Sequence, residues 1–194
     1  YLEFNKCDLR KKTILYANKC RKEICDCISK ILEETNYKIP ITIGSENIDK
    51  EDIESAGQGG FVGQYLELYF AKKCKKNFLL SEKGNYNPYD FQYLKSTEIK
   101  LVTNLKSHNI NCKQKYLAVA SGKQIKDFYL KNEETPKLLL VVRLNYGIIE
   151  ENYISYIKIC EIISYYLDEW IMKYTHSDGR AKNILCGRLQ EPTK

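Results

Sequence analysis

The feature that most constrains the fold is an almost unbroken apolar run in the second half of the chain. Residues 137–144 read Lys-Leu-Leu-Leu-Val-Val-Arg-Leu, with no alternation of polar and apolar positions. A strand covered on both faces has this composition, because neither of its faces meets water. We therefore expect a central strand here, with packed layers on both sides of its sheet.

Other patterned segments supply the rest of such a layered structure. Residues 6–35 lack Gly and Pro and have apolar positions mostly three or four apart, which predicts one long amphipathic helix or two short ones. Further helices are expected at about 61–76, 124–130 and 153–174, and strands at 78–80, 89–94 and 97–102, while 116–120 fits a strand or a helix. This order predicts an α/β or α+β fold, with helices packed on a central mixed β-sheet.

Length and composition define the class of protein. The chain has 194 residues, of which 43% are hydrophobic and 29% charged, and this suits one globular core without disulfide or metal staples. No stretch approaches the roughly 18 uninterrupted apolar residues of a membrane helix, so no membrane association is expected. We expect a single domain over 1–194, in which the helical segment 6–35 precedes a catalytic core at about 59–145.

The eight cysteines are expected to be reduced thiols. Their density lies well below the roughly 8–10% of disulfide-stapled secreted domains. Cys20, Cys25 and Cys27 are close in sequence, but the chain has no Cys-x-x-Cys pair and only two histidines, so the spacing does not favour a zinc site. This cysteine usage is typical of an intracellular protein, and we expect a cytoplasmic one.

Two carboxylates and a lysine stand out as a possible catalytic group. Side chains alternate along a strand, so Glu98 and Lys100 would project from one face while Ile99 and Leu101 point to the core. Asp90 lies on the preceding strand or its edge, and the seven residues between it and Glu98 suit a tight hairpin. The two acids and the lysine are then expected to converge at one end of the sheet.

This grouping suits metal-assisted cleavage of a phosphodiester. Mg²⁺ prefers oxygen ligands and is held by one or two carboxylates together with substrate phosphate; Mn²⁺ is the expected substitute. The ion polarises the phosphoryl oxygen and activates water, and a nearby lysine orients that water or stabilises the developing charge. The net charge is +6, from 31 Lys and Arg against 25 Asp and Glu. This excess of positive charge favours a polyanionic partner.

A third acid precedes this pair on an expected helix. In a helix, Glu67 shares a face with Gly60, Gly63, Gln64 and Ala71, at spacings of three, four and seven. Small residues on that face allow the helix to approach another backbone closely. Glu67 is therefore well placed to reach the cluster from a neighbouring layer.

These residues together resemble the PD-(D/E)XK nucleases, the superfamily that holds most type II restriction endonucleases. Asp90-Phe91 followed by Glu98-Ile99-Lys100 matches the core pattern of an acid, a strand and then Glu-x-Lys. The nearest form resembles the MutH mismatch-repair nicking enzyme and its restriction relatives. The helix pattern of that group, Gly-x-x-Gly-x-x-x-Glu, is matched by Gly60, Gly63 and Glu67.

The resemblance covers residues 59–102 and departs from the pattern at Tyr89, which separates Pro88 from Asp90. It implies a restriction-endonuclease-like core and a Mg²⁺-dependent endonuclease that cleaves double-stranded DNA, as a sequence-specific type II restriction enzyme or a nicking enzyme. A homodimer that cuts both strands and a monomer that nicks one are both open.

The resemblance also implies a role for each candidate residue. Asp90 and Glu98 would be the metal ligands, Lys100 the residue that orients the attacking water, and Glu67 an auxiliary acid supplied by the helix.

Two alternatives stay open. In the first, the chain is a basic nucleic-acid-binding module without catalysis, and Glu98 and Lys100 form an exposed pair worth about 0–1 kcal/mol. In the second, the same core serves a junction-resolving or transposon-type nuclease. Cleavage of plasmid only when Mg²⁺ is added would exclude the first, and a comparison of branched with linear substrates would separate the second.

Overall fold

The computed structural model of the chain describes residues 2–41, 50–74, 76–81, 88–96, 99–111, 116–130, 136–167, 184–185 and 188–192. Its helices are α1 (Leu2–Glu34), α2 (Lys50–Lys73) and α3 (Gly122–Leu130). Its strands are β1 (Lys38–Pro40), β2 (Phe78–Leu80), β3 (Phe91–Tyr93), β4 (Lys100–Asn109), β5 (Tyr116–Ser121), β6 (Lys137–Glu151), β7 (Ile154–Tyr166), β8 (Ile184–Leu185) and β9 (Arg188–Pro192).

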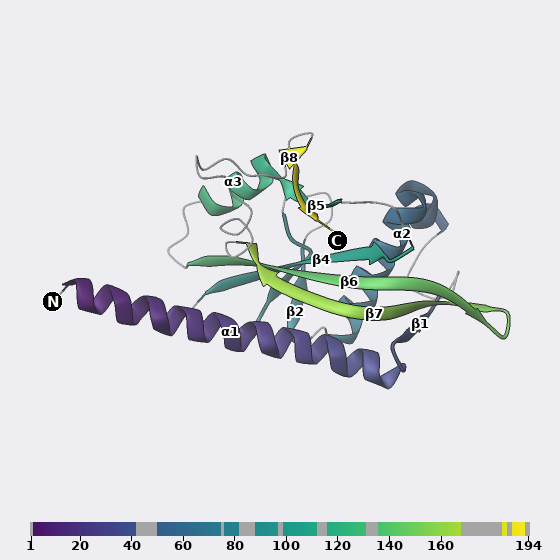
Figure 1. Cartoon of the computed structure of the whole chain (residues 1–194), viewed down its shortest axis with the longest axis horizontal. Helices are drawn as coiled ribbons and strands as arrows, with labels where there is room; N and C mark the ends of the chain where they lie inside the picture. The colour runs from purple at the N-terminus through teal and green to yellow at the C-terminus, as the bar shows by residue number, and fades with distance from the viewer. Residues whose placement is uncertain are drawn as a thin grey trace.

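Six of these strands form one mixed sheet in the order β1-β7-β6-β4-β3-β2. The β4–β6 pair is parallel, and the other neighbours are antiparallel. Strands β5, β9 and β8 form a second, smaller sheet (Figure 1). The expectation of an α+β fold built on a central mixed sheet with flanking helices is confirmed.

Strand β6 is the buried centre of the large sheet, as its composition predicts. It lies between β4 and β7, and five of its residues are fully shielded from solvent, namely Leu139, Leu140, Val141, Val142 and Leu144. The even-numbered members of this set join one hydrophobic cluster, and the odd-numbered ones join the other. The strand therefore separates two cores, which explains why its sequence does not alternate.

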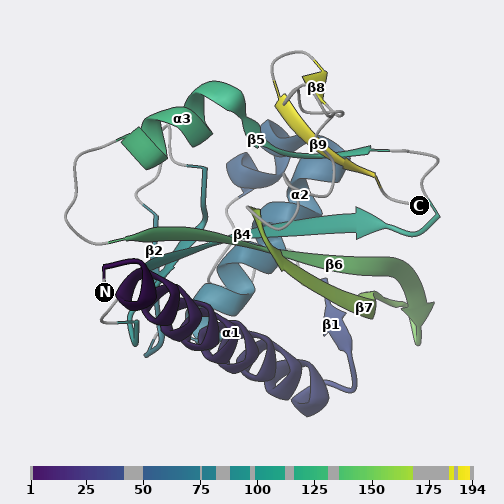
Figure 2. The ribbon, with the colours of Figure 1, turned by 60° about the vertical axis from the view of Figure 1, so that its left-hand side comes forward.

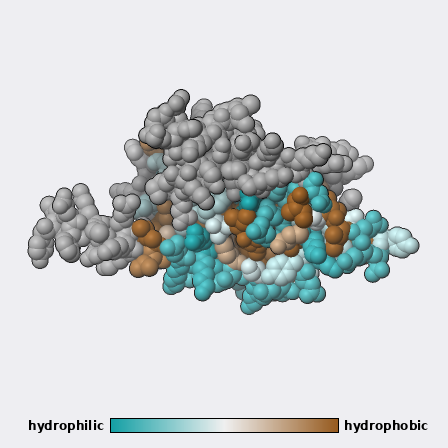
Figure 3. Space-filling view, viewed as in Figure 1, coloured by the Kyte–Doolittle hydropathy of each residue, from teal (hydrophilic) through white to brown (hydrophobic). Residues whose placement is uncertain are grey.

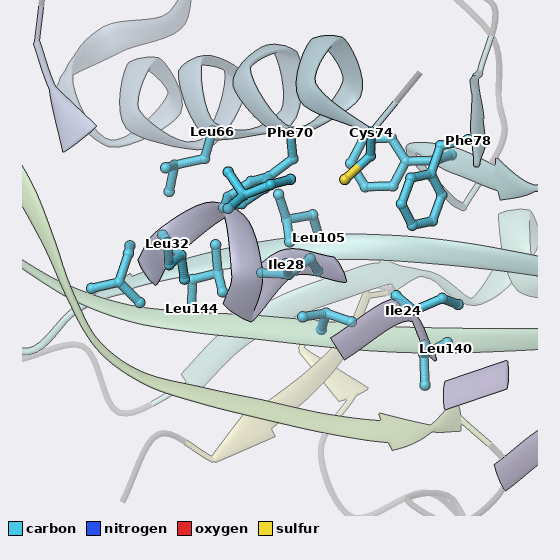
Figure 4. Packing of buried hydrophobic residues seen from close by; sticks show 14 of the residues in the cluster. Ile24, Ile28, Leu32, Leu66, Phe70, Cys74, Phe78, Leu105, Leu140 and Leu144 are labelled. Carbon is cyan, nitrogen blue, oxygen red and sulfur yellow. The ribbon is translucent and has the colours of Figure 1, made fainter. Parts of the chain in front are cut away.

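Helices α1 and α2 cover one face of the sheet. Residues one turn apart along α1 meet the apolar side of α2 over the side chains of β4 and β6 (Figure 4). The labelled members are Ile24, Ile28 and Leu32 of α1, Leu66 and Phe70 of α2, Leu105 of β4, and Leu140 and Leu144 of β6. The long Gly- and Pro-free segment is one continuous helix, and a single apolar stripe from Ala17 to Leu32 packs on the sheet.

The short helix α3 covers the opposite face. Phe128 of α3 packs against Val102, Leu139, Val141 and Leu167, and Figure 2 shows α3 and α1 on opposite sides of the sheet. The chain passes from β4 through β5 and α3 to the parallel strand β6, so this helix belongs to the crossover connection that parallel strands require.

The helix expected at 153–174 is wrong over its described part, because residues 154–166 form strand β7. Here Ile157 and Ile159 are buried while Lys158 between them is exposed, a period of two that suits a strand. Asn152 and Tyr153 have φ values of 51° and 66°, the left-handed conformation of a tight hairpin turn after β6. Isoleucine is β-branched and favours strands, and the edge of β6 that faces away from β4 needs a hydrogen-bonding partner. This segment therefore forms a strand and not a helix.

Two other boundaries also differ from expectation. Helix α2 begins at Lys50, before the predicted residue 61, and β4 continues to Asn109, beyond the predicted 102. The strand expected at 97–102 is described only from Ile99 onward, since residues 97 and 98 lie outside the described part.

The outer surface of α1 is mainly hydrophilic in its described part, with hydrophobic patches above it toward the sheet (Figure 3). In the segments that the structure describes, no helix has the length and apolar character needed to cross a membrane.

A pair of leucines on α1 tests the packing of this layer. Leu32 is 0% exposed, whereas Leu15 on the same helix is 69% exposed. We expect Leu32→Ala to lower the free energy of unfolding by about 2–5 kcal/mol, because it leaves a cavity. Leu15→Ala should change it by less than about 0.5 kcal/mol. Urea denaturation of both variants measures the difference, and equal losses would contradict the packing of α1 on the sheet.

Candidate active site

The register of the β3–β4 hairpin decides which residues face Asp90. Phe91 pairs with Thr103 and Gln92 with Val102, so Asn104 stands opposite Asp90. The backbone N–H of Asp90 donates to the carbonyl of Thr103 at 2.9 Å and not to that of Asn104, so the regular ladder ends at Phe91 and Asp90 lies just beyond it. Asp90 thus lies at the open end of the hairpin.

Lys100 lies at the other end of the same hairpin. It pairs with Lys137 of β6, and its backbone N–H donates to the carbonyl of Pro136 at 2.7 Å. Four residues separate it from the position opposite Asp90, roughly 13 Å along a strand. The structure therefore does not bring Lys100 beside Asp90.

The Asp90 carboxylate is fixed by the backbone of β4. Its Oδ2 accepts the Leu105 N–H at 2.6 Å. Since β3 begins only at Phe91, this carboxylate supplies the acceptor that another strand residue would otherwise give. One residue earlier on β4, the Asn104 side-chain amide donates to the carbonyl of Pro88 at 2.6 Å. The segment before β3 is thus tied to the middle of β4 at two points.

Helix α2 brings Glu67 to the same place. Leu66 and Phe70 hold the helix in the core, and a Cβ added at Gly63 would lie 3.5 Å from the Ser107 Oγ of β4. The α2 backbone therefore passes close to β4 one turn before Glu67, as the glycine-rich pattern predicts. This approach leaves the Glu67 carboxyl partly buried beside Asp90.

The charges of three side chains act on one another here. Burial, and then the Asp90 carboxylate, raise the pKa of Glu67 to about 7, while the Lys106 ammonium acts in the opposite direction. Burial likewise raises the pKa of Asp90, against the effects of the Lys106 charge and the Leu105 N–H. Glu67, Asp90 and Lys106 therefore lie within the range over which charges act on one another, and we call these three residues the acid–lysine cluster.

Further cationic and polar groups continue from Lys106 across the sheet. Lys106 pairs with Arg143 of β6, and His108 pairs with Asn145. Arg143 is only 6% exposed, and burial together with its charge lowers the pKa of His108. Asn145 in turn donates to Glu161 Oε2 of β7 at 2.6 Å. The acid–lysine cluster thus adjoins a row of buried polar side chains on the α3 face, in which Arg143 carries positive charge.

Sequence reasoning identified two members of this cluster and missed the third. Glu67 and Asp90 are brought together, Lys100 is placed apart from them, and Glu98 lies outside the described residues, so its role as a metal ligand stays a prediction. The signal for Lys106 was present, because Asn104, Lys106 and His108 alternate with Leu105 in a run that is too polar for an ordinary core strand.

Glu67 and Asp90 are the described residues that suit a divalent cation at this site. Carboxylate oxygens are the ligands that Mg²⁺ prefers, and two partly buried acids that hinder each other's ionisation favour a bound cation. Within the described residues, no group of three or more His, Cys, Asp and Glu side chains is arranged to hold a metal ion. Two acids with substrate phosphate and water are sufficient for magnesium.

A comparison with solved structures gives a weak structural similarity, without matching sequence relatives. No family model matches the chain, and no curated protein shows significant similarity to it. Among solved structures, it is similar to the NlaIV restriction endonuclease, with 17% sequence identity and a TM-score of 0.41 over 72% of this chain and 55% of that chain. The chain thus spans about half the length of that enzyme.

The raised pKa of Glu67 predicts a loss of stability with rising pH. The folded chain favours the protonated carboxyl, so this contribution is present below the unfolded pKa near 4.5 and is lost as pH rises through about 7. Without divalent cations, we expect the free energy of unfolding of the wild type to fall between pH 5 and pH 8, relative to Glu67→Gln, by an amount on the order of 2 kcal/mol.

Urea denaturation in EDTA at several pH values measures this difference. Glu33→Gln, at an exposed position on α1, is the matched control and should follow the wild type. Parallel curves for the wild type and Glu67→Gln would contradict a buried, mutually repelling pair of acids.

Proposed function

We propose that this chain is a Mg²⁺-dependent endonuclease of the PD-(D/E)XK type, which hydrolyses phosphodiester bonds of double-stranded DNA. One observation carries the proposal: two carboxyls and an ammonium group, from α2, from the segment before β3 and from β4, act on one another at the open end of a hairpin. Acid pairs with a lysine are the groups that metal-assisted phosphodiester cleavage requires.

Asp90 is the proposed principal metal ligand, because the Leu105 N–H holds its carboxylate in place. Glu67 supplies the second carboxylate from α2. When bound, Mg²⁺ supplies Lewis-acid polarisation of the phosphate. The protein's own contribution is to orient both acids before the cation arrives. Glu98, which the family pattern assigns as a ligand, remains a proposed third acid.

Lys106 is the proposed catalytic lysine. Its charge acts on both Glu67 and Asp90, and it follows Asn104 and Leu105 in the position that Glu-x-Lys occupies in the family pattern. An ammonium group there can orient the attacking water or stabilise negative charge on the phosphate. In this assignment, the amide of Asn104 stands where the pattern has an acid, and Lys100 is the competing candidate.

The basic groups next to the cluster support a nucleic-acid substrate. Lys106 and Arg143 lie on paired positions of β4 and β6, and the chain has a net charge of +6. Arg143 is buried, so its charge adds to the positive potential at the site and does not itself contact phosphate. The proposal includes sequence-specific restriction, nicking of one strand, and cleavage of both strands by a homodimer. Mapping of the cleaved ends distinguishes these modes.

The cleavage assay compares the two lysines directly. We expect the wild type to cut plasmid when Mg²⁺ or Mn²⁺ is added and not in EDTA. Asp90→Asn keeps a side-chain oxygen for the Leu105 N–H but removes the charge, and it should abolish cleavage. Lys106→Ala should reduce the rate by about 100-fold or more. Lys72→Ala, at an exposed position near the end of α2, is the control for general charge effects.

Cleavage by Lys100→Ala shows whether Lys106 or Lys100 is the catalytic lysine. A loss confined to Lys106→Ala supports the structural cluster, and a loss confined to Lys100→Ala supports the family pattern. Near-normal cleavage by Asp90→Asn would contradict the nuclease proposal altogether. Binding of a DNA duplex without cleavage by the wild type would favour the non-catalytic binding module.

Binding of the cation is measurable without catalysis. A ligand that binds only the folded state raises the melting temperature with its concentration. We expect Mn²⁺ to raise the melting temperature of the wild type by several degrees at pH 8, where few protons compete with the cation for the carboxylates, and to raise that of Asp90→Asn much less. Equal shifts in the two proteins would place the cation elsewhere.

A further inference from the structure

Two cysteines that are distant in sequence meet where α1 packs on the end of α2. Cys27 lies on α1, and Cys74 directly follows α2. Their Sγ atoms are 2.9 Å apart, although 47 positions separate them along the chain. Figure 4 shows the Cys74 sulfur at the end of α2, directed toward the layer that contains α1. Both are free thiols in the structure.

The surroundings make the two sulfurs chemically unequal. The Cys74 thiol, then the Asn77 amide at 3.6 Å and the Lys95 and Lys30 charges, lower the pKa of Cys27 to about 6. The hydrogen bond to Cys27 and burial raise the pKa of Cys74. Cys27 is partly exposed, whereas Cys74 is only 3% exposed. Cys27 is thus the partly exposed sulfur that ionises more readily, and in its ionised form it accepts a hydrogen bond from the buried Cys74 thiol.

We propose that Cys27 and Cys74 form a site of reversible oxidation, which a peroxide converts to a disulfide between α1 and α2. The Cys27 thiolate attacks one peroxide oxygen, the O–O bond breaks, and protonation gives Cys27 sulfenic acid and water. Cys74 then attacks the Cys27 sulfur, its proton leaves with the hydroxyl group as a second water, and the S–S bond forms. In total, two thiols are oxidised and one peroxide is reduced to two waters.

The geometry favours this pair over the other described cysteines. A disulfide bond is about 2.05 Å long, so the two sulfurs need to approach by only about 0.9 Å. Burial raises the pKa of Cys25, two residues before Cys27 on α1, and also that of Cys20. Cys160 is exposed, and its thiol donates to the Lys158 carbonyl at 3.6 Å. Exposure alone therefore does not make Cys27 the expected site of oxidation. The second sulfur beside it does.

The disulfide would stabilise the layer that presents Glu67. It would close the segment that contains β1 and α2, and it would restrict the unfolded chain more than the folded one. Glu67 lies seven residues before Cys74, so the bond would anchor the end of the helix that supplies this acid. The proposal does not depend on nuclease activity, since its chemistry involves the two sulfurs alone.

The test treats the full chain with hydrogen peroxide at neutral pH, blocks the remaining thiols and maps disulfide-linked peptides without reduction. We expect one linked pair that contains Cys27 and Cys74, a fall from eight titratable thiols to six, and recovery of all eight with dithiothreitol. The oxidised protein should melt several degrees higher than the reduced one. Cys27→Ser should lose the linked pair, the fall by two thiols and the rise in melting temperature, whereas Cys25→Ser and Cys160→Ser should retain all of these.

Cys74→Ala, which suits a buried position, removes the partner sulfur while Cys27 remains. Peroxide should then stop at the Cys27 sulfenic acid, which a dimedone probe detects as a mass increase. Linked peptides that pair other cysteines would overturn the proposal. So would loss of two thiols in Cys27→Ser, or oxidation of wild-type Cys27 beyond sulfenic acid with Cys74 still reduced.

Discussion

The burial of β6 on both faces is the constraint on which the rest of the structure depends. A strand that is apolar on both sides needs a hydrogen-bonded neighbour at each edge and a packed layer on each face. Strands β4 and β7 supply the edges, α1 and α2 supply one layer, and α3 supplies part of the other. The parallel β4–β6 pair requires a long crossover, and the same connection contains α3. The arrangement of strands and helices thus follows from the need to bury both faces and both edges of β6.

The candidate site arises where that order is incomplete. Strand β3 begins at Phe91, so the middle of β4 lacks a β3 residue beside Leu105, and the Asp90 carboxylate satisfies that N–H instead. Helix α2 must pass close to β4 to complete the core, and it brings Glu67 with it. The same packing that stabilises the fold therefore forces two acids together. Lys106 is the neighbouring charge that offsets part of their repulsion.

The sequence predicts those parts that depend on local patterns. The burial of β6, the position of α3 and the face of α2 that contains Glu67 are all readable, because composition and period determine them. Strand β7 was not, since isoleucines spaced three or four apart fit a helix until the open edge of β6 is considered. Lys106 was missed for a related reason. A Glu-x-Lys match says nothing about register, and the β3–β4 register, continued by one residue past Phe91, leads to Asn104 beside Asp90. The meeting of Cys27 with Cys74 depends on tertiary packing alone.

The acid–lysine cluster costs the folded protein stability, and this cost is an argument that the cluster has a function. Burial and mutual repulsion disfavour the ionised forms of Glu67 and Asp90, and one lysine only partly compensates them. An apolar or amide side chain at position 67 would be compatible with the same helix packing, because Leu66 and Phe70 already hold α2 in the core. A fold that keeps two carboxyls at such a position departs from the arrangement that favours stability, and such departures concentrate where a protein binds a cation or performs chemistry. A bound cation would explain why the two acids lie together, whereas their contribution to the stability of the fold does not.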